Sequence, residues 1–107
     1  MHAAGMQDLL ALLPAETQHR LVALYLELLG PGLAAVEATL HDAPAQAVQQ
    51  LHRVAGGAAM LQDHQVAQLA RAMERALLDD DVDQAIASWP ALLAAAASSR
   101  QLLQQRS

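Results

Sequence analysis

The chain has 107 residues, which is the size of one domain. Its net charge is −5, and arginine supplies all six positive charges, so it is a poor candidate for nucleic-acid binding. Hydrophobic residues make up 54% of the chain, which argues against disorder, and most of them are alanine (25) and leucine (20). β-Branched and aromatic residues are scarce, which excludes most all-β folds, and the absence of cysteine excludes disulfides and thiolate nucleophiles.

Two helical stretches are predicted in the first half of the chain. Residues 7–13 are leucine-rich and predict a short leading helix. Pro14 suits the first turn of the next helix, whose apolar residues recur at spacings of three and four as far as Leu40. Gly30-Pro31-Gly32 interrupts this pattern. We therefore expect either one long bent helix over 14–40 or two helices nearly in line.

A third long helix is predicted to begin at Pro44 and to present a face of small residues. Gly56 and Gly57 lie within this pattern. Each glycine costs about 1 kcal/mol relative to alanine inside a helix. Two adjacent glycines therefore predict that another group approaches this helix closely.

The remaining residues predict two more helices. Asp63 is a candidate N-cap for the first of them. Its predicted inward stripe consists of Val66, Leu69, Ala70, Met73 and Leu77. The acidic run 79–81 predicts a turn, and the last helix, over 82–104, is expected to bend or restart at Pro90. We therefore expect residues 1–107 to form one all-α domain, an up-and-down antiparallel four-helix bundle with a short extra N-terminal helix.

His52 differs from the other histidines because it lies in the middle of a predicted helix among small residues. Gly56 follows at i+4 on the same face and leaves space beside the ring, and Ala55 and Ala59 keep this strip shallow. Gln49 at i−3 is the nearest polar residue on the strip. This spacing predicts an imidazole that another protein can approach, although most helical histidines are ordinary surface residues. Of the other four histidines, His19 and His64 lie near predicted helix starts, His41 lies in a predicted loop and His2 lies at the terminus.

The segment that begins at His52 resembles the signature of histidine-containing phosphotransfer (HPt) domains of two-component phosphorelays, approximately His-x-Leu-Lys-Gly-x-[Ser/Ala]-x-x-Leu-Gly. The chain reads His-Arg-Val-Ala-Gly-Gly-Ala-Ala-Met-Leu-Gln at these positions. The resemblance continues downstream through Val66 and Ala70 to Met73-Glu74.

The resemblance implies a phosphocarrier rather than an enzyme. Nε2 of His52 would accept a phosphoryl group from a receiver-domain aspartate and pass it to the receiver domain of a response regulator. A neutral imidazole is a good nucleophile near pH 7, since histidine has a reference pKa of about 6.5. Glu74 stands where a side chain of the following helix can orient the other ring nitrogen. Alternatively, Glu74 pairs with Arg71 or Arg75 as an ordinary surface residue.

The implied partners are receiver domains of a hybrid histidine kinase, of a response regulator or of both. The receiver would bring its own aspartate pocket and Mg²⁺, so this chain is expected to need no cofactor or metal. Apolar residues between 9 and 29 are candidates for the docking surface, although most are expected to be core. We expect a cytoplasmic monomer that neither binds nucleic acid nor inserts into a membrane.

Two positions depart from the signature, and they leave an alternative function open. Ala55 replaces the usual lysine, which can neutralise a phosphoryl group, and Gln62 replaces the usual glycine. Arg53 cannot substitute for the lysine, because position i+1 points about 100° around the helix. Arg71 or Arg75 of the next helix could supply the charge. The alternative is a degenerate HPt-like adaptor that binds a receiver or kinase domain without being phosphorylated.

Other functions fit the sequence less well. A metal site in a helical bundle needs paired Glu-x-x-His motifs or histidines at i and i+4, whereas Glu16 and His19 form one unpaired motif. The serines at 88, 98, 99 and 107 lack the glycine-flanked turn of a nucleophilic serine. The first six residues do not resemble a signal peptide, and no apolar run is expected to reach the length of a membrane span.

Overall fold

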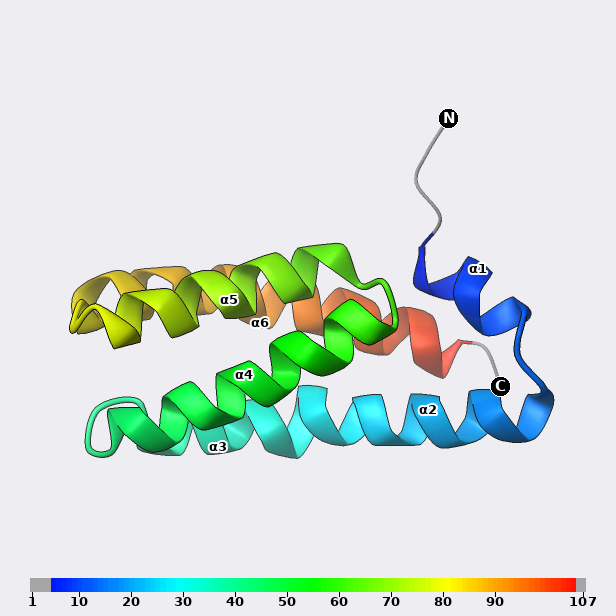
Figure 1. The fold of residues 1–107 in the computed structure, drawn as a ribbon, viewed down its shortest axis with the longest axis horizontal. Helices are drawn as coiled ribbons and strands as arrows, with labels where there is room; N and C mark the ends of the chain where they lie inside the picture. The colour runs from blue at the N-terminus through cyan, green and yellow to red at the C-terminus, as the bar shows by residue number, and fades with distance from the viewer. Residues whose placement is uncertain (1–4, 106–107) are drawn as a thin grey trace.

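The computed structural model describes residues 5–105, and every regular element in this range is helical (Figure 1). The predicted all-α fold class is therefore confirmed, and no strand occurs between residues 5 and 105. In chain order the elements are α1 (Met6–Ala11), α2 (Ala15–Glu27), the π-helical segment η1 (Leu28–Gly32), α3 (Leu33–Thr39), α4 (Pro44–Met60), α5 (His64–Leu78) and α6 (Val82–Gln104).

The segments α2, η1 and α3 form one continuous rod (Figure 1), which decides between the two arrangements that the sequence allowed. Pro31 lies inside η1. Proline lacks an N–H group and its ring clashes with the carbonyl of the preceding turn, so a wider π-helical turn accommodates it without ending the helix.

The rod also corrects the expectation that no apolar run reaches the length of a membrane span. The stretch Ala15–Thr39 is a 25-residue helix that is long and apolar enough to cross a membrane, by length and composition only. A core helix of a soluble protein and a signal sequence near the N-terminus both pass the same test, and 28% of the apolar window is buried. In this structure Tyr25, Leu29 and Leu33 of the stretch are buried in the protein core.

The longer helices pack side by side around one core. α4 contacts α3, η1 and α5, and α5 contacts α6 (Figure 1). Small side chains let these helices approach closely. The buried alanines are Ala47, Ala55, Ala58, Ala67, Ala70, Ala76, Ala85, Ala95 and Ala96. On α5 the predicted stripe is buried except for Leu69, which is half-buried, and Ala67 and Ala76 widen it.

Asp63 precedes α5 as expected, but its side chain does not cap the helix. Instead, its Oδ2 accepts one hydrogen bond from the Tyr25 hydroxyl and one from the Ser99 hydroxyl, each 2.6 Å long. Because Tyr25 belongs to α2 and Ser99 to α6, one carboxylate joins three parts of the chain. Burial, together with the hydrogen bond and negative charge of Asp63, raises the pKa of Tyr25 well above its usual value.

The expected restart at Pro90 does not occur, since α6 is continuous from Val82 to Gln104. Pro90 and Ile86, four residues earlier, are both exposed. The Ile86 carbonyl, which loses its N–H partner to proline, can therefore bond to water. At the start of α6, Asp81 caps the helix by accepting a hydrogen bond of 3.1 Å from the backbone N–H of Gln84.

Candidate functional site

His52 stands on the exposed side of α4, with 78% of its side chain accessible to solvent. Its Nδ1 lies 3.0 Å from Oε2 of Glu74 on α5, whose side chain is only 18% exposed. A carboxylate can only accept hydrogen bonds, so in the neutral imidazole Nδ1 carries the proton and Nε2 carries the lone pair. The contact between α4 and α5 thus orients an exposed imidazole with Nε2 as its free nucleophilic atom.

The two adjacent glycines of α4 have different surroundings. A Cβ atom added to Gly57 would lie 2.5 Å from Cδ1 of Leu28, so this is the glycine that another helix approaches closely. A Cβ atom added to Gly56 would meet nothing within 4 Å, not even the His52 side chain. Gly56 therefore leaves open space on the surface next to the imidazole.

The residues around His52 on α4 take different directions. Gln49 and Arg53 are exposed and line a depression shared with Ala35 and Thr39 of α3. Ala55, at the position of the usual lysine, is 3% exposed and belongs to the core, so it does not contribute to the surface strip beside the ring. As a result, α4 places no cation on the Glu74 side of His52.

α5 supplies the charged surroundings of the imidazole. A shallow depression of about 230 Å³ is lined by His52, Arg71, Glu74, Arg75 and Leu78. The four α5 residues share one side of the helix, because they are spaced by three, one and three positions. Both arginines are exposed, and neither forms an ion pair within 4 Å, so Glu74 pairs with His52 and not with a neighbouring arginine.

Apolar side chains form a second surface feature beyond Gly56. A groove of about 180 Å³ lies between the rod and the end of α4. Its most exposed members are Met60 (73%) and Leu24 (57%). The full lining is Leu21, Leu24, Tyr25, Leu28, Gly57, Met60 and Leu61. Because Met60 follows Gly56 by four residues, its exposed side chain lies one helical turn beyond the open surface beside His52.

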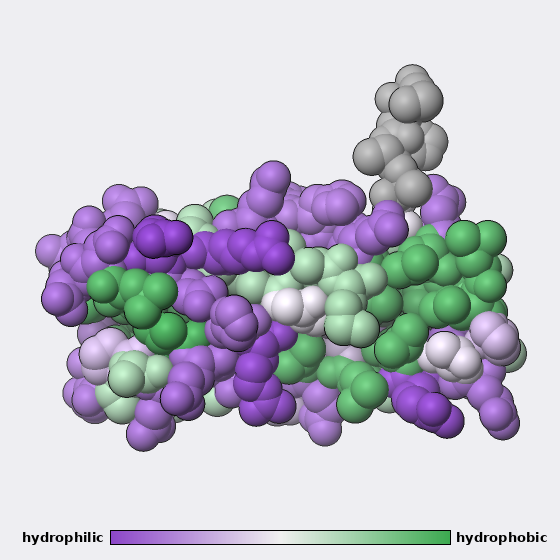
Figure 2. Space-filling model, viewed as in Figure 1, coloured by the Kyte–Doolittle hydropathy of each residue, from purple (hydrophilic) through white to green (hydrophobic). Residues whose placement is uncertain are grey.

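Within residues 9–29, the part of the chain considered for a docking surface, apolar side chains are exposed in two places. Leu21 and Leu24 belong to the groove, whereas Leu12 of the segment after α1 is 82% exposed elsewhere. On the face drawn in Figure 2, hydrophobic residues gather at the end of the molecule where α1 lies. The expectation that most of these residues are core is wrong. Only Leu10, Tyr25 and Leu29 are buried, and the partly buried ones that pack against the core are Leu9, Leu13, Leu21, Val22, Leu26 and Leu28.

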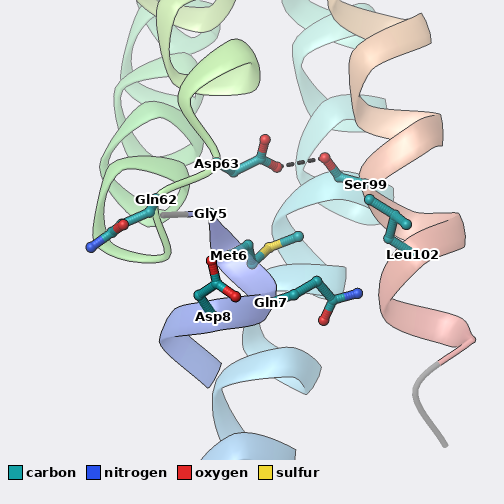
Figure 3. A pocket seen from close by; sticks show the side chains of 8 residues that line it. All are labelled: Gly5, Met6, Gln7, Asp8, Gln62, Asp63, Ser99 and Leu102. Carbon is teal, nitrogen blue, oxygen red and sulfur yellow. Dashed lines mark hydrogen bonds between the residues drawn. The ribbon is translucent and has the colours of Figure 1, made fainter. Parts of the chain in front are cut away.

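A third depression, of about 320 Å³, adjoins the hydrogen-bonded Asp63 (Figure 3). Sequence reasoning missed the cluster that Asp63 forms with Tyr25 and Ser99. The sequence indicates this cluster only weakly: Tyr25 has a polar hydroxyl but lies in an apolar stripe, and Ser99 carries a hydroxyl in an alanine-rich helix. The same carboxylate oxygen accepts hydrogen bonds from both hydroxyls, so it stabilises the packing of α2 and α6.

The remaining candidate residues do not gather into another site. Glu16 and His19, which formed the unpaired motif, are both exposed on α2. Within residues 5–105, no group of three or more histidine, aspartate and glutamate side chains is arranged to hold a metal ion. His2 and most of the segment considered as a signal peptide lie outside the described residues. Comparisons of the chain with protein-family models, with curated proteins and with solved structures find no match.

Proposed function

We propose that this protein is a phosphorelay intermediate of the HPt type. In this proposal His52 accepts a phosphoryl group from a receiver-domain aspartate and passes it to the receiver domain of a response regulator. The observation that carries the proposal is the exposed His52 imidazole with its Nδ1 held by Glu74 at 3.0 Å. The rod, α4, α5 and α6 would act as an up-and-down four-helix bundle, with α1 as the extra helix.

The transfer step follows from the orientation of the ring. The lone pair of Nε2 attacks the phosphorus of the aspartyl phosphate and forms an N–P bond. The P–O bond to the aspartate breaks, and the carboxylate leaves with the electron pair. The ring keeps its proton on Nδ1 and gains a positive charge, which the negative carboxylate of Glu74 stabilises. Transfer to the second receiver is the reverse of this step.

The surface around His52 suits a protein partner. Gly56 leaves room beside the ring, and the groove at Met60 and Leu24 offers apolar contact area one turn away. Exposed apolar area next to a reactive group is typical of a surface that buries against a partner. The receiver would supply the aspartate pocket and Mg²⁺, and this protein would act as a cytoplasmic monomer that presents its histidine.

One observation favours the alternative of an adaptor that is not phosphorylated. Ala55 is buried where the family signature has lysine, so α4 brings no cation next to His52. An adaptor would use the same open surface and the same apolar groove to bind a receiver or kinase domain, without forming the N–P bond.

Transfer from a phosphorylated receiver tests the proposal. A receiver domain of a hybrid kinase from the same genome is phosphorylated on its aspartate and mixed with the wild type, His52→Gln or His64→Gln. His64 is a matched control because it is an exposed histidine at the start of α5. We expect acid-labile phosphate on the wild type and on His64→Gln, and none on His52→Gln.

A further variant and a binding measurement separate the two functions. Glu74→Gln removes the negative charge that stabilises the ring, so we expect transfer to slow about ten- to hundredfold. Isothermal titration with the same receiver measures binding independently of phosphate. Binding without phosphorylation supports the adaptor, whereas equal labelling of wild type and His52→Gln overturns the phosphorelay proposal.

A further inference from the structure

We propose that Arg71 and Arg75 of α5 together neutralise the phosphoryl group on His52 and so replace the lysine that the family signature places where this chain has Ala55. This inference rests on the proposed function, since it concerns the phosphorylated form of His52.

The geometry of α5 brings both arginines to the reacting histidine. Arg71 and Arg75 line the same depression as His52 and Glu74. Both are exposed, and neither is engaged in a hydrogen bond or ion pair within the described part of the chain. Their guanidinium groups are therefore free to turn toward the phosphoryl group on Nε2. Arginine suits this role because its planar fork of N–H groups matches the spacing of phosphate oxygens.

The local charges require such neutralisation. A phosphoryl group adds a charge of about −1.5 to −2 at pH 7. Glu74, which orients the ring at 3.0 Å, adds a further negative charge on the same side. Arg71 and Arg75 contribute two positive charges, so the α5 side of the depression has a net positive charge before phosphorylation. Leu78, the remaining residue of the depression, is uncharged.

The other arginines of the described chain do not line this depression. Arg53 follows His52 directly but lines the depression on the α3 side of α4. Arg20 and Arg100 are exposed residues of α2 and α6 that line neither depression. A buried alanine at position 55 leaves α5 as the source of positive charge beside the imidazole.

A small phosphoryl donor tests the inference without a partner protein. Phosphoramidate phosphorylates histidine directly: Nε2 attacks phosphorus, the N–P bond of the donor breaks, and ammonia leaves. The rate of His52 labelling is followed by phosphorus NMR for the wild type, His52→Gln, the pair Arg71→Gln/Arg75→Gln and the pair Arg71→Lys/Arg75→Lys. The matched control is Arg20→Gln/Arg100→Gln, which removes the same two charges at other positions.

We expect labelling of Arg71→Gln/Arg75→Gln to be about three- to tenfold slower than that of the control pair, from the usual strength of partly exposed ion pairs. Lysine at both positions should restore most of the rate. The wild-type rate should also fall with added salt more steeply than the rate of the glutamine pair, because salt screens the two charges. A purely structural role would not produce this salt dependence.

Two results would overturn the inference in distinguishable ways. Equal rates for the glutamine pair and the control pair would show that the arginines do not neutralise the phosphoryl group, while the proposed function would stand. If the wild type is labelled no faster than His52→Gln, both the proposed function and the inference are overturned. Circular dichroism of each variant verifies that the helical fold is intact.

Discussion

The contrast between the two adjacent glycines of α4 gives a sharp prediction. Alanine is favoured over glycine inside a helix by about 0.8–1 kcal/mol. At Gly56 the added Cβ meets nothing within 4 Å, so Gly56→Ala should retain the whole gain. For a domain of this size, about 1 kcal/mol corresponds to a rise in Tm of about 4–8 °C.

Gly57→Ala is the matched control, since it offers the same gain in helix propensity in a crowded place. The added Cβ would lie 2.5 Å from Cδ1 of Leu28, so the leucine side chain must move. Leu28 is half-buried and lines the groove, so its methyl group can turn away, and the change costs part of the gain in helix propensity. Thermal and urea denaturation followed by circular dichroism should therefore rank Gly56→Ala above the wild type and above Gly57→Ala.

The stabilising change at Gly56 should also impair function. The new methyl group occupies the open surface beside His52, so phosphoryl transfer from a receiver should slow in a protein that is more stable than the wild type. If Gly56→Ala is no more stable than Gly57→Ala or the wild type, the surface beside the imidazole is not open and the reasoning fails. If it is more stable and transfers at the wild-type rate, a partner does not need that space.

Three further predictions concern the end of α4 and the cluster that Asp63 forms. Gln62, at the signature's glycine position, has φ 61°, and Gln62→Gly should stabilise the protein by about 1 kcal/mol because glycine adopts this left-handed conformation without strain; urea denaturation measures the gain, and a loss would contradict the reasoning. Asp63→Ala removes the hydrogen-bond acceptor of the Tyr25 and Ser99 hydroxyls, so the free energy of unfolding should fall by about 2–4 kcal/mol. An unchanged urea midpoint would show that the cluster does not contribute to stability. The raised pKa of Tyr25 predicts that the free energy of unfolding is constant below pH about 10 and declines above it, because the unfolded chain then loses a tyrosine proton that the native state retains. Denaturation experiments between pH 9 and 11 should show a smaller decline for Tyr25→Phe than for the wild type. An equal decline in both proteins would refute the assignment.

The helical elements and the local surroundings of His52 could be predicted from the sequence alone. Helix starts at Pro44 and breaks at the acidic run 79–81 follow from backbone chemistry that acts within a few residues. Apolar spacing predicted the all-α class for the same reason, since side chains three and four positions apart share a helix face. The placement of Gly56 beside His52 is likewise a property of a single helix.

Contacts between groups of different helices depend on how the helices pack against one another. The sequence allowed either glycine of the pair to be the crowded one, and the position of Leu28 assigns that role to Gly57. It suggested Asp63 as a helix cap, whereas the Asp63 carboxylate accepts hydrogen bonds from hydroxyls of α2 and α6. It named Arg71 and Arg75 as candidate neighbours of His52, but only the fold shows that both line the same depression as the histidine. These contacts depend on how each helix is rotated about its axis and where it crosses its neighbour, and spacing along the chain does not encode either quantity.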